Sequence, residues 1–141
     1  MIIKQLSIFL ENKAGRLTEV TEILAAQEIN IAALCIAETS DYGILRLIVN
    51  SPDKAIEALK SKGFSVSLTD VLCILIPHEV GALASAVKKL SDNSISVEYM
   101  YAFAMGDKTP VIIRVDEIER ANKIIGKLGI QQISTEDIYK L

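Results

Sequence analysis

The stretch FLENKAGRLTEV at residues 9–20 returns in altered form as LIPHEVGALASA at residues 75–86, 66 positions later. Gly15 of the first stretch coincides with Gly81 of the second. In both copies a segment of alternating apolar residues leads up to the glycine, and a segment with helical spacing of apolar residues follows it. The sequence therefore predicts the same strand–turn–helix unit twice.

An offset of 66 residues aligns the two halves of the chain without a gap. No linker rich in Pro, Gly or Ser separates them, and a unit of under 70 residues is marginally stable alone, so we expect the halves to pack together. We interpret the chain as a tandem repeat with domains at residues 1–69 and 70–141. The identities that support this fall on turn glycines and on regularly spaced positions, and they include Leu6/Leu72, Ile8/Ile74, Gly15/Gly81, Leu17/Leu83, Leu24/Leu90, Ile29/Ile95, Asp41/Asp107, Ala55/Ala121, Gly63/Gly129 and Thr69/Thr135.

The composition indicates a globular, cytoplasmic protein. Half of the residues are apolar, 23% are charged, and Gly (7) and Pro (3) are few. A net charge of −3 without a basic run argues against nucleic acid as a partner. Apolar runs such as VLCILI are far below the ~20 residues of a membrane span, and the N-terminal stretch lacks the features of a signal peptide. Cys35 and Cys73 lie in apolar runs, which predicts two buried thiols.

The hydrophobic period alternates between that of strands and that of helices. The order in each half is βαββαβ, which predicts the α+β fold class: two ferredoxin-like domains in tandem, each an antiparallel sheet with helices on one face. A hairpin turn is expected at TSDYG, residues 39–43. The expected strands are at residues 4–10, 31–38, 44–49, 64–68, 71–76, 96–103, 111–115 and 131–133, and the expected helices at 16–28, 54–62, 81–91 and 118–128.

The third strand of each half is apolar on both sides. ILRLIV at residues 44–49 is interrupted only by Arg46, and VIIRV at residues 111–115 only by Arg114. A sheet with two apolar faces usually stacks against another sheet or chain, so we expect self-association as a homodimer. We interpret the two arginines as part of an exposed edge or of an interface salt bridge, in preference to a ligand clamp.

Several function classes are disfavoured. An RNA-binding sheet needs a basic surface and aromatic residues on its central strands, whereas Tyr99, Tyr101 and Phe103 lie on one expected strand and are interpreted as core or interface. His78 is the sole histidine and has no cysteine pair nearby, so no metal site is expected. No nucleophile–base pair stands beside the loop at residues 12–16, so we expect no catalytic residues, no cofactor and no enzyme activity.

The loop ENKAGRL has two interpretations from its residues. The free N–H groups at the start of the helix could bind a carboxylate, with Gly15 allowing close approach and Asn12 offering both a donor and an acceptor. Alternatively, the loop is a tight turn that needs glycine for its dihedral angles alone. Asn30, which opens the next strand, could likewise bind a ligand or form a turn.

The stretch FLENKAGRLTEVTEILAAQEINIAAL resembles the signature of the ACT domain, the amino-acid-sensing module of many biosynthetic enzymes. The resemblance rests on an Asn-x-x-Gly loop, Asn12 to Gly15, and on an Asn-Ile pair, Asn30 and Ile31, fifteen residues past the glycine. It is similar to the regulatory domain of phosphoglycerate dehydrogenase and to the regulatory subunit of acetolactate synthase. The resemblance implies a tandem ACT pair with no catalytic domain attached, which binds a free amino acid and regulates an enzyme of amino-acid metabolism. A purely structural assembly module is the alternative.

In that family, sites form where the loop of one domain meets the second strand of its partner. The resemblance therefore implies two ligand sites between the halves if these pair side by side. The residues of one site are Asn12, Lys13, Ala14, Gly15, Arg16 and Leu17 with Ser96 and Val97. The residues of the other are His78, Glu79, Val80, Gly81, Ala82 and Leu83 with Asn30 and Ile31. The effector's carboxylate is expected on the N–H groups of residues 14–17. Because His78 and Ser96 replace asparagines of the pattern, we expect the two sites to differ and the Asn12 loop to be the working one.

Overall fold

The computed structural model of the chain describes residues 1–38 and 41–141. It divides into two compact units: the first unit is Lys4–Thr69, and the second unit is Asp70–Leu141 together with Met1–Ile3. The helices and strands follow one another in the order β1 Ile2–Glu11, α1 Arg16–Ala26, β2 Ile31–Glu38, β3 Tyr42–Val49, α2 Pro52–Ser61, β4 Ser65–Pro77, α3 Ala82–Asp92, β5 Val97–Ala102, β6 Lys108–Val115, α4 Ile118–Lys127, β7 Gln131–Gln132 and α5 Thr135–Ile138.

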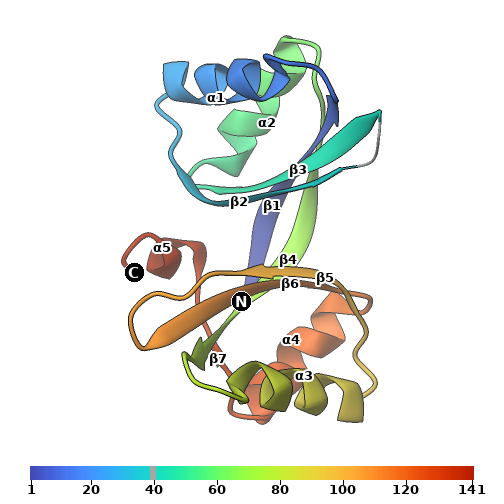
Figure 1. The fold of residues 1–141 in the computed structure, drawn as a ribbon, viewed down its shortest axis with the longest axis vertical. Helices are drawn as coiled ribbons and strands as arrows, with labels where there is room; N and C mark the ends of the chain where they lie inside the picture. The colour runs from blue at the N-terminus through green and yellow to red at the C-terminus, as the bar shows by residue number, and fades with distance from the viewer. Residues whose placement is uncertain (39–40) are drawn as a thin grey trace. The chain divides into compact units, whose positions relative to one another are not determined.

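The first unit is a sheet with strand order β2-β3-β1-β4 and with α1 and α2 on one face (Figure 1). Strands β1 and β2 both run antiparallel to β3. The alternation of β1 sends every second side chain towards the helices, as the sequence predicts. The core between the sheet and the helices contains Leu6, Ile8, Leu10, Val20, Leu24, Ile29, Leu45, Leu47, Val49, Ala55, Leu59 and Val66.

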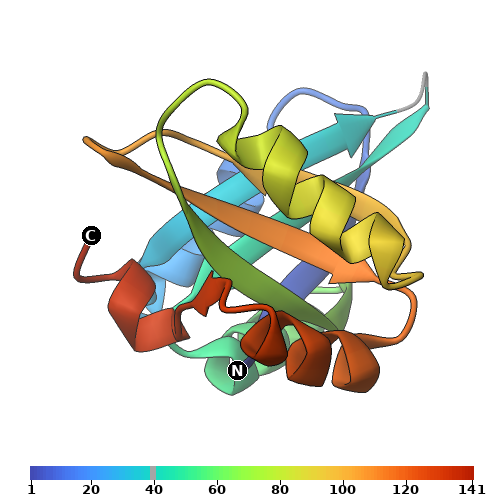
Figure 2. The same cartoon turned by 90° about the horizontal axis from the view of Figure 1, so that it is seen from below.

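The second unit repeats this arrangement with strand order β5-β6-β4-β7. Strands β4 and β5 both run antiparallel to β6, and β7 runs antiparallel to β4. Helices α3 and α4 lie on the same face of the sheet (Figures 1 and 2). Their buried residues, Ala86, Leu90, Ala121 and Ile125, are the counterparts of Val20, Leu24, Ala55 and Leu59 at the offset of 66. The predicted ferredoxin-like fold is confirmed in both units.

Strand β4 corrects one prediction. The sequence predicts separate strands at residues 64–68 and 71–76, but the structure has one strand of 13 residues, Ser65–Pro77. No glycine or proline stands between Ser65 and Ile76 to interrupt it, and the carbonyl of Asp70 accepts a hydrogen bond of 2.9 Å from Arg114. Strand β4 therefore passes without a break through the boundary between residues 69 and 70.

Helix α5 is a feature that the sequence analysis missed. Ser134 caps it, because the Ser134 hydroxyl accepts a bond from the N–H of Asp137 while the Asp137 carboxylate accepts one from the N–H of Ser134. The Ser134 hydroxyl also donates to the Asp137 carboxylate at 2.8 Å, and this bond, together with the one from the Ser134 N–H, holds the pKa of the Asp137 carboxyl below its ordinary value. Ile138 of this helix is buried. The hairpin turn expected at residues 39–43 includes Thr39 and Ser40, which lie outside the described residues.

The third strands, β3 and β6, are apolar on both faces as predicted, and Ile48 and Ile112 of their second faces are already buried within the single chain. Arg114 forms an ion pair of 3.3 Å with Glu98 on the neighbouring strand. The sequence led us to expect an exposed edge or an interface salt bridge, whereas this salt bridge lies within the sheet of its own unit. Cys73 is buried, and burial raises the pKa of its thiol to about 12. The prediction of a second buried thiol is wrong in degree, because Cys35 is only half-buried near the edge of its sheet.

Candidate functional site

The two glycine loops have nearly the same backbone. Gly15 caps α1 with φ 90° and ψ −13°, and Gly81 caps α3 with φ 87° and ψ −10°. Both lie in the left-handed region that favours glycine, so the turn does require glycine for its dihedral angles. Apart from the glycine and its two neighbours in the chain, no described atom lies within 4 Å of the position that a Cβ would take at either residue. The space above each glycine is therefore open, and close approach of a ligand is sterically possible as well.

Three backbone hydrogen bonds recur in both loops at the offset of 66, and the first loop has a fourth, from Lys13 N to Glu11 O at 2.8 Å. The first closes the loop onto an aspartate carbonyl after the second strand of the unit, the second makes a tight turn before the helix, and the third begins the helix. The first joins Asn12 N to Asp41 O in the first unit and His78 N to Asp107 O in the second (both 2.9 Å). The second joins Arg16 N to Lys13 O (3.3 Å) and Ala82 N to Glu79 O (3.2 Å). The third joins Glu19 N to Gly15 O and Ser85 N to Gly81 O (both 2.9 Å).

Unpaired N–H groups are left at each helix start. Within residues 1–38 and 41–141, no hydrogen bond engages the N–H groups of Gly15, Leu17 and Thr18, and the same holds for their counterparts Gly81, Leu83 and Ala84. Neither helix has a side-chain cap in this part of the chain. These exposed donors lie at the positive end of a helix dipole, where a carboxylate is stabilised.

Asn30 and Ile31 do not lie beside the loop of their own unit. They follow the far end of α1, and an 11-residue helix is about 16 Å long. The Asn30 side chain accepts a bond of 3.0 Å from the N–H of Ile31, and its backbone exchanges bonds with Asn50 at 3.2 and 3.3 Å. Asn30 therefore has the structural role that its turn interpretation predicts. Its pairing with the loop of the other half stays a prediction.

The second unit has the same junction with different side chains. The N–H of Ser96 donates to the Asp116 carboxylate at 3.2 Å, and the N–H of Asp116 returns a bond to the carbonyl of Ser96 at 3.2 Å. Asn50 and Asp116 are counterparts at the offset of 66, and the sequence analysis missed both. The signal that could have found them is a polar residue directly after each third strand.

The side chains around the first loop neutralise one another. Lys13 lies 2.9 Å from the Glu11 carboxylate, and Arg16 lies 3.7 Å from Glu11 and 3.1 Å from Glu19. The Lys13 ammonium, which is also hydrogen-bonded to Glu11, and the Arg16 guanidinium hold the pKa of the Glu11 carboxyl below its ordinary value. The cations of this loop are thus already paired with carboxylates of their own unit.

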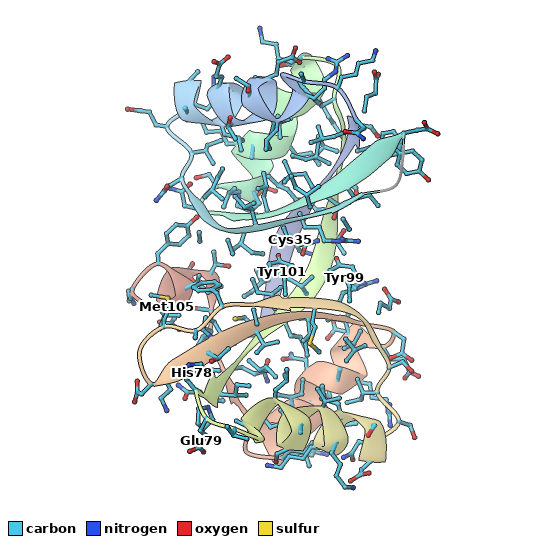
Figure 3. All side chains as sticks on the ribbon, viewed as in Figure 1. Cys35, His78, Glu79, Tyr99, Tyr101 and Met105 are labelled. Carbon is cyan, nitrogen blue, oxygen red and sulfur yellow. The ribbon has the colours of Figure 1, made fainter. Side chains whose placement is uncertain are left out.

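The second loop is less occupied by its own side chains. His78 and Glu79 project from the turn between β4 and α3 (Figure 3), and His78 Nδ1 lies 3.3 Å from the Thr109 hydroxyl. Val80 is fully exposed. No ion pair involves residues 78–83 in the part of the chain that the structure describes. Tyr99 and Tyr101 project from β5 on the side away from α3 and α4 (Figure 3), whereas Met100 between them packs into the core.

The family model of the ACT domain pair matches residues 1–141. The chain belongs to the ACT domain pair family. A solved structure from Bacteroides thetaiotaomicron is 49% identical over 100% of this chain and 98% of that chain, with a TM-score of 0.95. Regulatory subunits of aspartate kinase from Thermus thermophilus and Thermus flavus share the fold at 16% and 17% identity, with TM-scores of 0.65 and 0.61, over 90% of this chain and 94% of each of theirs. No curated protein matches the sequence.

The two loops of the ACT pair border cavities of different size. Beside the first loop lies a depression of about 110 Å³, lined by Asn12, Arg16, Leu17 and Ile36 among others. Beside the second loop lies a cavity of about 520 Å³, to which Glu79, Val80, Gly81 and Ala82 contribute. Small-molecule sites typically measure about 300–1,000 Å³. Of these two, only the cavity beside the second loop has a volume in that range.

Other features of the ACT pair carry less chemistry. An open groove of about 740 Å³ runs between α1 and α2 in the first unit, with Ile23, Ala58 and Phe64 among its lining residues. Nowhere in residues 1–38 and 41–141 do three or more His, Cys, Asp or Glu side chains gather as metal ligands would. Over the same residues no helix is both long and apolar enough to cross a membrane.

Proposed function

We propose that the chain is a cytoplasmic regulatory protein that binds a free amino acid at its glycine loops. The observation that carries the proposal is the loop itself, built twice with the same left-handed glycine and the same unpaired N–H groups. The ligand carboxylate would lie on these donors. The residues proposed to hold it are Asn12, Lys13, Ala14, Gly15, Arg16 and Leu17, and His78, Glu79, Val80, Gly81, Ala82 and Leu83, with Asn30, Ile31, Ser96 and Val97 at the strand starts.

The energetic requirement of such a site is modest. A micromolar dissociation constant corresponds to about −8 kcal/mol. For a ligand of about eight heavy atoms this is about −1 kcal/mol per atom, which lies inside the ceiling of about −1.5 kcal/mol per atom for small ligands. A carboxylate on backbone donors and an ammonium on a side-chain acceptor are therefore sufficient contacts.

The proposed output is regulatory and involves no catalytic step or cofactor. Residues 1–69 and 70–141 act as two ACT domains, and the ligand stabilises one conformation of the pair. A partner enzyme of amino-acid metabolism, or a second copy of the chain, responds to that conformation. The aspartate kinase subunits named above share only the fold with this chain, so the proposal extends to amino-acid-metabolising enzymes as a class.

An amino-acid panel in a thermal-shift assay tests the proposal. A ligand at 100 times its dissociation constant adds about 2.7 kcal/mol to the free energy of unfolding, which raises Tm by several degrees for a chain of this length. We expect one or a few of the twenty amino acids to do so. A flat response to all twenty at millimolar concentration would contradict ligand binding and favour the alternative, an assembly module whose glycines only turn the chain.

We further propose that the chain forms a homodimer through β2. This strand pairs with β3 alone within the described residues, and its Leu34 and Ile36 are 52% and 44% exposed although they face the helix side of the sheet. An unpaired strand edge with exposed apolar side chains favours association with another chain. The depression beside the first loop includes Ile36, so a second copy along β2 would also deepen that depression.

Light scattering tests the dimer. We expect twice the mass of the 15.4 kDa chain, and we expect Ile36→Lys to weaken dimerisation at least tenfold because it places a charge on the strand edge. Ser61→Lys, on the exposed end of α2, is the matched control and should leave the dimer intact. A wild-type monomer at working concentration, or a dimer that resists Ile36→Lys, would refute association through β2.

A further inference from the structure

We infer that the cavity beside the His78–Leu83 loop is the ligand site of the chain and that it takes an amino acid with an acidic side chain. The inference rests on the proposed function. It further specifies which half of the chain binds the amino acid and to which class that amino acid belongs. It reverses the expectation from the sequence, which favoured the loop at Asn12.

The cavity lies within the second unit, between the first turns of α3, the end of β4 and the turn from α4 to β7. Its volume is about 520 Å³. Ala82, Ser85, Ala86 and Lys89 line it with helical spacing, so one face of α3 forms a wall. The volume falls in the range of small-molecule sites and exceeds what an amino acid of about ten heavy atoms needs.

The corresponding place in the first unit is filled by its own side chains. There Arg16 lies between the carboxylates of Glu11 and Glu19, at 3.7 and 3.1 Å. At the offset of 66 the second unit replaces all three charged residues with small uncharged ones: Pro77 for Glu11, Ala82 for Arg16 and Ser85 for Glu19. The ion-pair network is therefore absent where the cavity opens, although the backbone of the loop is the same.

An aromatic pair at the same corner is also missing from the second unit. Phe9 and Tyr42 stack in the first unit with ring centroids 4.7 Å apart, and Leu75 and Lys108 take their places in the second. At this corner of the first unit, beside Phe9, Arg16 and Phe64, the cavity measures about 220 Å³, and the larger groove of that unit lies further along, between α1 and α2. The repeat thus supplies an internal comparison, in which the corner beside the loop is narrower in the first unit than in the second.

The charged side chains that line the cavity of the second unit indicate the class of ligand. Lys89 and Lys108 line the cavity, where the first unit has Ile23 and Tyr42. Within the described residues no hydrogen bond or ion pair engages the side chains of Lys89, Lys108, Ser85 or Glu79. Two ammonium groups match two carboxylates, and the single carboxylate of Glu79 matches one ammonium. A dicarboxylic amino acid carries this set of charges, with aspartate and glutamate as the natural examples.

Calorimetric titration of the full chain with glutamate, aspartate, glutamine and asparagine tests the inference. We expect an acidic amino acid to bind at least tenfold more tightly than its amide. Ala82→Arg, which places in the cavity the residue that fills the first unit, should weaken binding at least 100-fold. A triple variant, Pro77→Glu with Ala82→Arg and Ser85→Glu, also supplies the carboxylates that hold that arginine, and it should have the same effect in a folded chain.

Two further variants separate the effect of the positive charge in the cavity from the effect of the cavity volume. Lys108→Met should weaken binding of the acidic amino acid at least tenfold while leaving the weak binding of its amide unchanged. Lys123→Met, which removes the charge of an exposed lysine of α4 outside the cavity, is the matched control and should leave the affinity unaltered. Circular dichroism checks that each variant is folded.

The possible failures are distinguishable. If an acidic amino acid binds tightly to the folded Ala82→Arg and triple variants, or if a neutral amino acid binds most tightly and is indifferent to them, the inference is overturned while the proposed function stands. If none of the twenty amino acids binds, the proposed function itself fails.

Discussion

Replacing Leu24 with alanine is expected to lower the free energy of unfolding by about 3–5 kcal/mol. Leu24 of α1 is 0% exposed and lies in the core between the helices and the sheet of the first unit. The substitution removes buried methyl groups and leaves a cavity that the close-packed surroundings fill only in part. For a chain of this length the loss corresponds to a fall in Tm of about 10 °C or more.

The matched change in the second unit is Leu90→Ala in α3, whose leucine is 1% exposed. We expect it to lower the single unfolding transition to the same degree, because β4 runs through both units without a break. Scanning calorimetry gives the number of transitions, and circular dichroism follows their Tm. Leu17→Ala and Leu83→Ala, at exposed positions, are controls with losses below about 1 kcal/mol. Two transitions, of which each core variant moves only one, would refute this coupling.

Hydrophobic period predicted the helices and strands well where the pattern is local. Strand β2, Ile31–Glu38, has the predicted bounds, and α1 begins at the predicted Arg16. The end of α1 was predicted two residues too late, because Glu28 takes a left-handed conformation with φ 56° although it is not a glycine. Its counterpart Ser94 does the same with φ 57°, so this turn recurs in both units without a residue type that announces it.

Features that depend on distant parts of the chain were less predictable. Whether Thr69 and Asp70 form a turn or continue β4 depends on the strands that pair with them, and period alone does not identify those strands. Helix α5 is short, and its capping box uses Asp137 in place of the usual glutamate or glutamine. For these two reasons, local sequence pattern predicted neither the unbroken strand β4 nor helix α5.

The candidate site also has a part that local sequence pattern predicts and a part that it does not. The glycine loops were predicted because Gly15 and Gly81 have a local backbone role that the repeat makes visible. The cavity beside the second loop was not predicted, because it results from the absence of side-chain volume and charge at Ala82 and its neighbours. A position-by-position comparison of the two halves of the sequence would have shown where the charged residues of the first half are replaced by small uncharged ones in the second.

Replacing Gly81 with valine is expected to destabilise the chain by about 2–3 kcal/mol, because a β-branched residue at φ 87° is strongly strained. Gly15→Val, at φ 90°, should have the same effect. Replacement by asparagine should lower the stability by less than valine does, because asparagine tolerates the left-handed conformation better than a β-branched residue. Thermal melts of the four variants without ligand measure these differences.

Asparagine at position 81 then separates the two roles of the glycine. If the open space above Gly81 admits a ligand carboxylate, Gly81→Asn should fold normally and yet lose the thermal shift that the bound amino acid produces, because its side chain occupies that space. Gly15→Asn is the matched control and should retain the shift, since the proposed cavity lies in the other unit. A Gly81→Asn variant that melts like the wild type and still responds fully to the amino acid would leave this glycine with a backbone role alone.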